Sequence, residues 1–411
     1  MNRIRVLFLP PYFGFPSHFI PLVKLYQRMS AARYDVAFVL PRLTPEEITA
    51  RKSYGFEQGR YYYEPEFLAR FELPVLDLKQ QFSVVAELAA YRKFSPDLII
   101  DDSNLTTALA RQIRRLPRLT IARTGVFGGA STPVHGHSLA SVVGTLSLPP
   151  RSTLVLPQSI DGYFEAEAHI VPASPLLEPL PGLRALGTRS FYCGPLILDQ
   201  DEERLFDTEP LSAFLAANRG RKIVYLTLGI GASRNPHPSA WECLRELLAQ
   251  DWAIVTNMMP ADYAGETECP YPHDRCFYSP ALPLHFVCSR ADLIIHVCGS
   301  ATYHYPILHR KPAITIGTQC RDREEVARRL CARGLSYHLP APTETAAFQT
   351  NFTEALGLYA AARFPFDAAL PARLETMRLE IESTAARFDI DAAIDSALSA
   401  APCVHSVAHP S

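Results

Sequence analysis

Two residue types near the N-terminus have the chemistry of a general base and its partner. His18 precedes the amphipathic stretch FIPLVKL, and Asp101 and Asp102 end the apolar run LII. An imidazole, with an unperturbed pKa near ~6.5, can remove a proton from a hydroxyl group. A carboxylate that accepts from the other ring nitrogen fixes the tautomer and stabilises the imidazolium. Ordinary roles are also open, since a histidine can start a helix and Asp102 is a good N-cap.

The residues from Gly299 to Thr302 have the composition of an anion-binding turn. They follow the apolar run DLIIHV and lead into a predicted helix. Amide groups at a helix start, the helix dipole and the hydroxyls of Ser300 and Thr302 could hold a phosphate without a net positive charge. Many strand–turn–helix junctions carry glycine and serine, so the spacing alone leaves this role open.

The charge and hydrophobic composition limit the partners of this chain. It has 411 residues, with 40 Lys and Arg against 42 Asp and Glu. This balance gives no field that would gather a polyanion, so nucleic acid and anionic membranes are not expected partners. A hydrophobic content of 48% supports large cores in roughly two to three domains. No stretch reaches the roughly 20 apolar residues of a membrane-spanning helix, and we expect a cytoplasmic protein.

Patterns typical of metal sites and disulfides are weak. The nine cysteines are dispersed, and the closest pair, Cys269 and Cys276, has no His or Cys couple beside it. Buried, reduced thiols are the expected state. His135 and His137 form an H-x-H pair, but two histidines without a third ligand are more typical of a loop. The sequence predicts no metal site.

The first half of the chain alternates strand patterns with helical patterns. Strands are predicted at IRVLFL, DVAFVLP, PDLIID and LTIART, and two more at STLVLPQS and SFYCGPLI. Such alternation predicts a parallel sheet covered by helices, because continuous apolar runs suit strands buried on both faces. The opening apolar run is short and ends in Pro-Pro, which favours a strand over a signal peptide.

The same alternation begins again at Lys222 and continues through five further apolar runs to LSYHL. The predicted fold class is α/β, with two facing doubly wound Rossmann-like domains. Ligands are expected in the crevice between the domains, at the carboxyl ends of the strands. The expected divisions of the chain are a first domain at 1–200, a linker at 201–221, a second domain at 222–375, a helix at 376–400 that packs back toward the first domain, and a tail at 401–411.

Three stretches resemble the UDP-glycosyltransferase superfamily, the family 1 glycosyltransferases of GT-B fold, and especially its bacterial natural-product members. FPSHFIPLVKL matches the family's G-x-G-H-x-x-P turn at His18 and Pro21, RKIVYLTLG matches a second-domain strand, and 281–317 matches almost without a gap. The resemblance implies an inverting, metal-independent hexosyltransferase of antibiotic or other natural-product biosynthesis. Its co-substrate would be a nucleoside-diphosphate sugar, its acceptor a hydroxyl of a small apolar molecule, and no cofactor is implied.

The resemblance assigns roles to individual residues. His18 is the general base that deprotonates the acceptor, and Asp102, more than Asp101, orients it. The first domain binds the acceptor and the second binds the donor. The donor site is expected to include Gly229 and Ile230 in a closing loop and Leu282 near the nucleobase of the donor. Gly299, Ser300, Ala301 and Thr302 are expected under the diphosphate.

Several family positions differ in this chain. The second histidine of the family's HHGG motif, which contacts the diphosphate, aligns with Val297, and the first aligns with His296, which could substitute for it. Leu284 replaces a glutamine near the base or ribose. Tyr305 replaces the glutamate with which UDP-selective members bind both ribose hydroxyls, and this change fits a dTDP-linked donor better. Asp322, in the segment QCRDR, could contact the sugar hydroxyls.

Other functions stay open at this point. A non-catalytic relative that binds a ligand or a partner enzyme would also show the changed donor positions. An epimerase of the same architecture is less favoured, because the first-strand histidine turn matches transferases better. The aromatic residues Phe13, Phe15 and Phe127 and the segment 54–74 suggest a pocket for a planar or macrocyclic acceptor, although aromatic packing alone would explain them. The oligomeric state is also open, and a homodimer is one of the alternatives.

Overall fold

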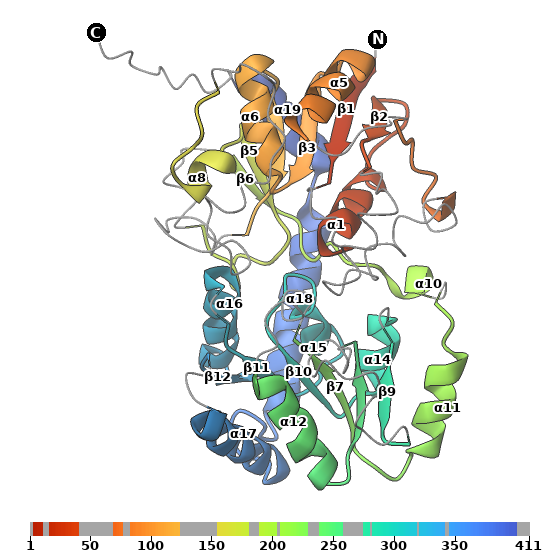
Figure 1. Ribbon diagram of the computed structural model, residues 1–411, viewed down its shortest axis with the longest axis vertical. Helices are drawn as coiled ribbons and strands as arrows, with labels where there is room; N and C mark the ends of the chain where they lie inside the picture. The colour runs from red at the N-terminus through yellow and green to blue at the C-terminus, as the bar shows by residue number, and fades with distance from the viewer. Residues whose placement is uncertain are drawn as a thin grey trace. The chain divides into compact units, whose positions relative to one another are not determined.

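The computed structural model describes twelve stretches of the chain, which divide into two compact units (Figure 1). Of the described residues, unit 1 contains those up to Leu196 and those from Thr384 onward, and unit 2 contains Ile197 to Ser383. The described stretches are 3–10, 16–40, 69–76, 83–123, 154–180, 189–203, 206–228, 238–257, 274–279, 282–318, 320–341 and 345–400.

Unit 1 is built on a six-stranded parallel sheet with the order β2-β1-β3-β4-β5-β6. Its central strands are continuous apolar runs, as expected for strands covered on both faces. The strands are β1 (Ile4–Leu9), β2 (Tyr34–Phe38), β3 (Leu98–Asp102), β4 (Arg118–Ile121), β5 (Ala168–Val171) and β6 (Arg189–Tyr192).

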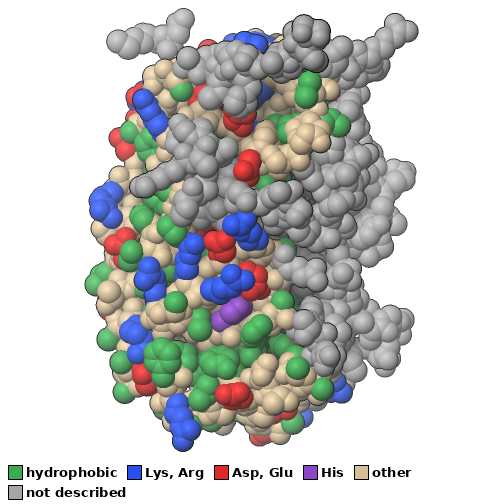
Figure 2. Space-filling view, turned by 90° about the vertical axis from the view of Figure 1, so that its left-hand side faces the viewer, with side chains coloured by type: hydrophobic (Ala, Val, Ile, Leu, Met, Phe, Trp, Pro, Cys, Tyr) green, Lys and Arg blue, Asp and Glu red, His purple; other side chains and the backbone are tan. Residues whose placement is uncertain are grey.

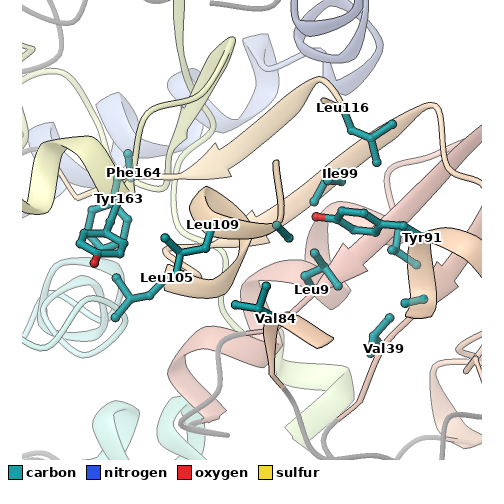
Figure 3. Close-up of a cluster of buried hydrophobic side chains, with 14 of the residues drawn as sticks. Leu9, Val39, Val84, Tyr91, Ile99, Leu105, Leu109, Leu116, Tyr163 and Phe164 are labelled. Carbon is teal, nitrogen blue, oxygen red and sulfur yellow. The ribbon is translucent and has the colours of Figure 1, made fainter. Parts of the chain in front are cut away.

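Alternate residues of these strands pack against different helices. Leu7, Leu9 and Ile99 belong to a core cluster with residues of α5 (Val84–Phe94), α6 (Leu105–Ile113) and α8 (Ile160–Tyr163), seen in Figure 3. Phe8 points to the opposite face, where it stacks on Phe38 at 4.6 Å between ring centroids. The ring of Phe19, from α1 (Pro16–Tyr26), meets the same Phe38 edge-on. The sheet of unit 1 therefore has an α5/α6 face and an α1 face.

The C-terminal helix α19 (Ile390–Ser399) belongs to unit 1. It follows α18 (Leu370–Arg387), within which the contact boundary between the units falls, and it contacts β3, β4 and β5. Asp391 of α19 accepts a hydrogen bond from the hydroxyl of Tyr34 and forms an ion pair with Arg33, at the start of β2. The helix α19 is thereby fixed to the sheet that contains the first strands of the chain.

Unit 2 repeats the architecture with a parallel sheet of order β12-β11-β10-β7-β8-β9. Its strands are β7 (Ile223–Thr227), β8 (Ala253–Thr256), β9 (Cys276–Tyr278), β10 (Leu293–His296), β11 (Ala313–Ile316) and β12 (Tyr337–Leu339). Its helices are α10 (Gln200–Glu203), α11 (Glu209–Ala217), α12 (Pro238–Ala249), α14 (Leu284–Arg290), α15 (His304–Leu308), α16 (Arg321–Ala332) and α17 (Thr345–Ala360). The two doubly wound sheets confirm the predicted fold class.

One strand differs from the sequence prediction. The strand predicted at STLVLPQS is wrong: residues 154–158 form no strand, Val155 is 56% exposed, and its backbone bonds the side chain of Gln112. The fully buried run AHIV forms β5 instead, because it fills the place beside β4. Within the segment predicted as a linker, Leu211 and Phe214 of the helix α11 are part of the unit 2 core.

The surface carries charges of both signs, and the cysteines of the described stretches form no disulfides. On the face shown in Figure 2, basic and acidic side chains are interspersed. On α16, Arg321 and Arg329 each pair with Glu325 across one helical turn, at 3.1 and 3.0 Å. Every cysteine in the described stretches is a free thiol, and none of the helices described there is long and apolar enough to cross a membrane.

Candidate functional site

Asp101 and Asp102 end β3 on opposite faces of the unit 1 sheet. Because side chains alternate along a strand, Asp101 shares the α5/α6 face with Ile99, and Asp102 shares the other face with Ile100. The α1 helix contacts β3 on that second face. There, Nδ1 of His18 lies 3.2 Å from Oδ2 of Asp102. The structure brings together the two residues predicted as base and partner.

The surroundings suit an imidazole that meets a substrate and a carboxylate that does not. The Asp102 side chain is fully buried, whereas the His18 side chain is 15% exposed. Within the described stretches, neither oxygen of Asp102 accepts a regular hydrogen bond. The negative charge of Asp102 therefore acts on the His18 ring, whose Nδ1 is 3.2 Å away. Phe19, which is fully buried, anchors the first turn of α1 and so holds His18 beside the strand.

Asp101 has a different partner, which the sequence did not reveal. The fully buried guanidinium of Arg118 donates from Nε and NH2 to the two oxygens of Asp101, at 2.9 and 2.6 Å. Arg118 is the first residue of β4, the neighbouring strand. An arginine that opens an otherwise apolar run was the only signal, and it is equally typical of an exposed strand end. The pairing explains why only Asp102 is directed to His18.

A second buried acid lies on the α5/α6 face. Glu87 accepts hydrogen bonds from Tyr91 and from Oγ1 of Thr106, the latter at 2.5 Å. Burial raises the pKa of Glu87 to about 7, against the hydrogen bonds that lower it. The interior beneath β3 is therefore a polar layer within an apolar core.

In unit 2, β10 ends at His296, which is fully buried. Its Nδ1 accepts a hydrogen bond from the backbone N–H of Cys298, at 3.1 Å. Burial lowers the pKa of His296 to about 3, so the ring is neutral at physiological pH and carries its proton on Nε2. Cys298 itself has a positive φ of 51°, a conformation that residues other than glycine seldom adopt.

The predicted anion-binding turn follows directly. Gly299, Ser300, Ala301 and Thr302 are all partly exposed, and the first helical hydrogen bond runs from Tyr303 N to Gly299 O at 3.3 Å. The amides of residues 300–302 precede that bond and so have no partner within the helix. The helix expected after Gly299 is α15, which has only five residues. The local amides and hydroxyls, more than a helix dipole, are what this turn presents.

The residues at changed family positions are mostly core residues. Val297 and Tyr305 are 4% and 3% exposed, and the Tyr305 ring meets His285 edge-on at 4.9 Å between centroids. Leu282, expected near the base, is 6% exposed and packs in the same core cluster, against which Leu284 is partly buried.

Asp322 is the second residue of α16, at the end of a loop with an internal support. Glu324 accepts from the backbone N–H of Thr318, and its Oε2 lies 3.3 Å from Nε2 of His338. The other nitrogen of His338 lies 3.0 Å from Oγ1 of Thr315. This chain of polar groups ties the loop to β11 and β12, and its members were not predicted as site residues.

Five predicted site residues and four other sequence features lie outside the described stretches. The residues are Gly229 and Ile230 of the donor site and Phe13, Phe15 and Phe127 of the acceptor pocket. The features are most of the aromatic segment (54–68), the H-x-H pair at His135 and His137, Cys269, and the tail at 401–411.

Two six-stranded parallel sheets of this topology define the GT-B fold. No family model matches the sequence, and no curated protein does. Solved structures of glycosyltransferases, however, match the fold along nearly the whole chain. The glycosyltransferase of kitacinnamycin has a TM-score of 0.63 and 17% identity, and the match covers 97% of this chain and 100% of the other.

Two further similar structures contain different nucleotides. The spinosyn rhamnosyltransferase SpnG complexed with thymidine diphosphate has a TM-score of 0.57 at 19% identity, covering 93% of this chain and 98% of the other. UDP-glucose: anthocyanidin 3-O-glucosyltransferase in complex with UDP has a TM-score of 0.58 at 15% identity, covering 97% and 100%. The chain therefore has the GT-B fold expected from the resemblance.

Proposed function

We propose that this protein is an inverting glycosyltransferase. It would move a sugar from a nucleoside-diphosphate donor to a hydroxyl group of a small apolar natural product. The observation that carries the proposal is the pair formed by His18 and the buried Asp102, 3.2 Å apart at the carboxyl end of β3. Ligands of doubly wound folds bind at that end of the strands.

The pair supplies the base for the reaction. With Nδ1 on the side of Asp102, His18 would take the proton of the acceptor hydroxyl on Nε2. The acceptor oxygen then forms a bond to the anomeric carbon as the bond from that carbon to the donor diphosphate breaks. The diphosphate leaves with the electron pair, and Asp102 stabilises the imidazolium that results.

The turn after β10 would bind the leaving diphosphate. The amides of residues 300–302 and the hydroxyls of Ser300 and Thr302 are donors for phosphate oxygens, and neutral His296 adds the proton on Nε2. Donors fixed in place before the reaction stabilise a developing anion without reorganising. This chemistry requires no metal and no cofactor besides the nucleotide sugar. Asp322 would contact sugar hydroxyls, and Gly229, Ile230 and Leu282 complete the proposed donor site.

The proposed donor is dTDP-linked. Tyr305 replaces the carboxylate that would bind both ribose hydroxyls, and its ring is buried against His285, so it restores no such acceptor. Among the similar structures, SpnG holds thymidine diphosphate. The acceptor would be an apolar molecule that meets Phe13, Phe15 and Phe127, and the enzyme would act in the cytoplasm.

Calorimetric titration with dTDP and with UDP tests the proposal. We expect dTDP to bind more tightly than UDP, and a dTDP-sugar to release dTDP only when an acceptor is present. Failure to bind either nucleotide would overturn the proposal and would favour a non-catalytic binding protein. Release of free nucleotide without an acceptor would also contradict it.

A further inference from the structure

We propose that Asp101 and Arg118 are positioning residues for the pair of His18 and Asp102, an inference that rests on the proposed function. Both side chains are fully buried on the α5/α6 face, whereas Asp102 and His18 meet on the other face. They would therefore act on the reaction through the β3 turn and not by contact with substrate.

Every N–H of the Arg118 guanidinium has an acceptor. Nε and one NH2 proton bind the two oxygens of Asp101, and the second NH2 proton goes to Asn104 O at 3.0 Å. The NH1 group donates to the carbonyls of Tyr163 and Glu165, at 2.7 and 3.2 Å. A planar fork with all five donors used has one orientation, so Arg118 is a rigid support.

This support holds the turn that follows Asp102. Asp101 Oδ2 accepts the backbone N–H of Asn104 at 2.7 Å, and Arg118 binds the carbonyl of the same residue. Ser103, which lies between Asp102 and Asn104 in the sequence, has a φ of 55°, and its hydroxyl donates to Ile121 O at 3.1 Å. A strained backbone persists only where its neighbours fix it. These two hydrogen bonds, the clamp on Asn104, therefore fix the backbone that follows Asp102.

The pair also settles the charge at the end of β3. Asp101 and Asp102 are adjacent in the sequence, and the side chains of both are fully buried. Arg118 neutralises Asp101 within a bidentate ion pair, which leaves the Asp102 carboxylate as the charge directed at His18. Without the pair, the position of the orienting carboxylate would change.

A double-mutant cycle between Asp101→Asn and Asp102→Asn tests this coupling. Asp101→Asn keeps an oxygen for the Asn104 amide but removes the charge that holds Arg118. We expect kcat to fall roughly 10- to 100-fold at unchanged donor KM, because a small misplacement of a catalytic group is costly. In the Asp102→Asn background the same change should cost less than about threefold. An equal loss in both backgrounds would overturn the proposal.

A second variant and a control guard against misfolding. The double variant Asp101→Asn/Arg118→Met removes both buried charges, which proteins tolerate better than one unpaired charge. It also removes the clamp, so the same loss of kcat is expected, and full activity would contradict the proposal. Arg33→Met is the control: it breaks a partly exposed ion pair with Asp391 in the same unit and should leave kcat unchanged.

A readout without turnover separates this proposal from the proposed function. The ¹⁵N spectrum of the His18 ring reports which nitrogen carries the proton, and we expect the Nδ1–H form to lose population in Asp101→Asn. If wild-type protein transfers no sugar, the proposed function fails while this spectrum still tests the clamp. A His18 spectrum identical in wild type and Asp101→Asn would overturn the positioning role.

Discussion

The turns after β3 in unit 1 and after β10 in unit 2 share a backbone feature and differ in what holds them. Each follows a strand whose last residue is fully buried, Asp102 or His296. Each contains a residue other than glycine with positive φ, Ser103 at 55° and Cys298 at 51°. Such a conformation costs roughly 1–2 kcal/mol, so both turns hold their shape against a local cost.

The supports of the two turns indicate different tasks. The β3 turn is fixed by side chains and charges, chiefly the pair of Asp101 and Arg118. The β10 turn is fixed by a backbone bond from Cys298 to the neutral ring of His296, and it presents amides and hydroxyls. Charged side chains suit proton transfer, and backbone donors suit an anion. Changes in the first turn should therefore affect the chemical step, and changes in the second should affect donor binding.

The largest effect is expected from Asp102→Asn. The amide cannot stabilise the imidazolium and favours the wrong tautomer of His18, so kcat should fall roughly 10²–10⁴-fold. Steady-state kinetics with a dTDP-sugar and an acceptor would measure it. Donor affinity should not change, and a variant that instead lost dTDP binding with normal kcat would break the division between the two turns.

A smaller effect is expected from Thr302→Val, which keeps the shape of the side chain and removes its hydroxyl. Loss of a hydrogen bond to a charged phosphate should weaken dTDP binding roughly 10- to 100-fold, with kcat at saturating donor unchanged. Titration calorimetry would measure the affinity. Ser289→Ala, which removes an exposed hydroxyl on α14 of the same unit, is the control and should bind dTDP normally.

The smallest effect concerns the acid stability of the two units. Burial lowers the pKa of His296 to about 3 and of His309 to about 4 in unit 2, and of His169 to about 4 in unit 1. Unfolded imidazoles take up protons below about pH 6.5 and these native ones do not, so acidification favours unfolding. Glu87 and Glu203, one in each unit, act oppositely, because burial raises the pKa of each to about 7 and the native carboxyl keeps its proton above pH 4.5.

Among the described groups, one imidazole and one carboxyl nearly cancel in unit 1, whereas unit 2 has imidazoles in excess, because burial also lowers the pKa of His285 there. As the pH falls from 6.5 to 4.5, unit 2 should therefore lose more stability than unit 1. Hydrogen exchange at the amides of β3 and β10, corrected for the intrinsic rate, would compare them. His309→Gln should reduce the difference, and greater acid sensitivity in unit 1 would refute the assignment of these charges.

The fold and the candidate residues His18, Asp101 and Asp102 were predictable because their signals are local. Apolar runs with turn residues between them indicate parallel strands, and a histidine or an aspartate at a strand end is visible in one short stretch. The rule that carboxyl ends of parallel strands lie at one edge placed His18 near the two aspartates, and the choice of Asp102 over Asp101 came from the family resemblance. The missed strand β5 shows the limit, since AHIV has four residues and a weaker pattern than STLVLPQS.

The supports of the site were not predictable because they depend on pairing across the sheet. Arg118 is buried only because β4 lies beside β3 and Asp101 offers both oxygens. Likewise, His338 reaches Thr315 and Glu324 only once β12 pairs with β11. In a sequence each of these residues is typical of a solvated strand or helix end.

The most direct test of the proposed chemistry is the single-turnover rate of sugar transfer by His18→Ala beside wild type, with a dTDP-sugar bound at saturation. Removal of a general base should slow transfer roughly 10²–10⁴-fold while dTDP binding stays at the wild-type level. A transfer rate for His18→Ala equal to that of wild type would contradict the role of His18 and with it the mechanism.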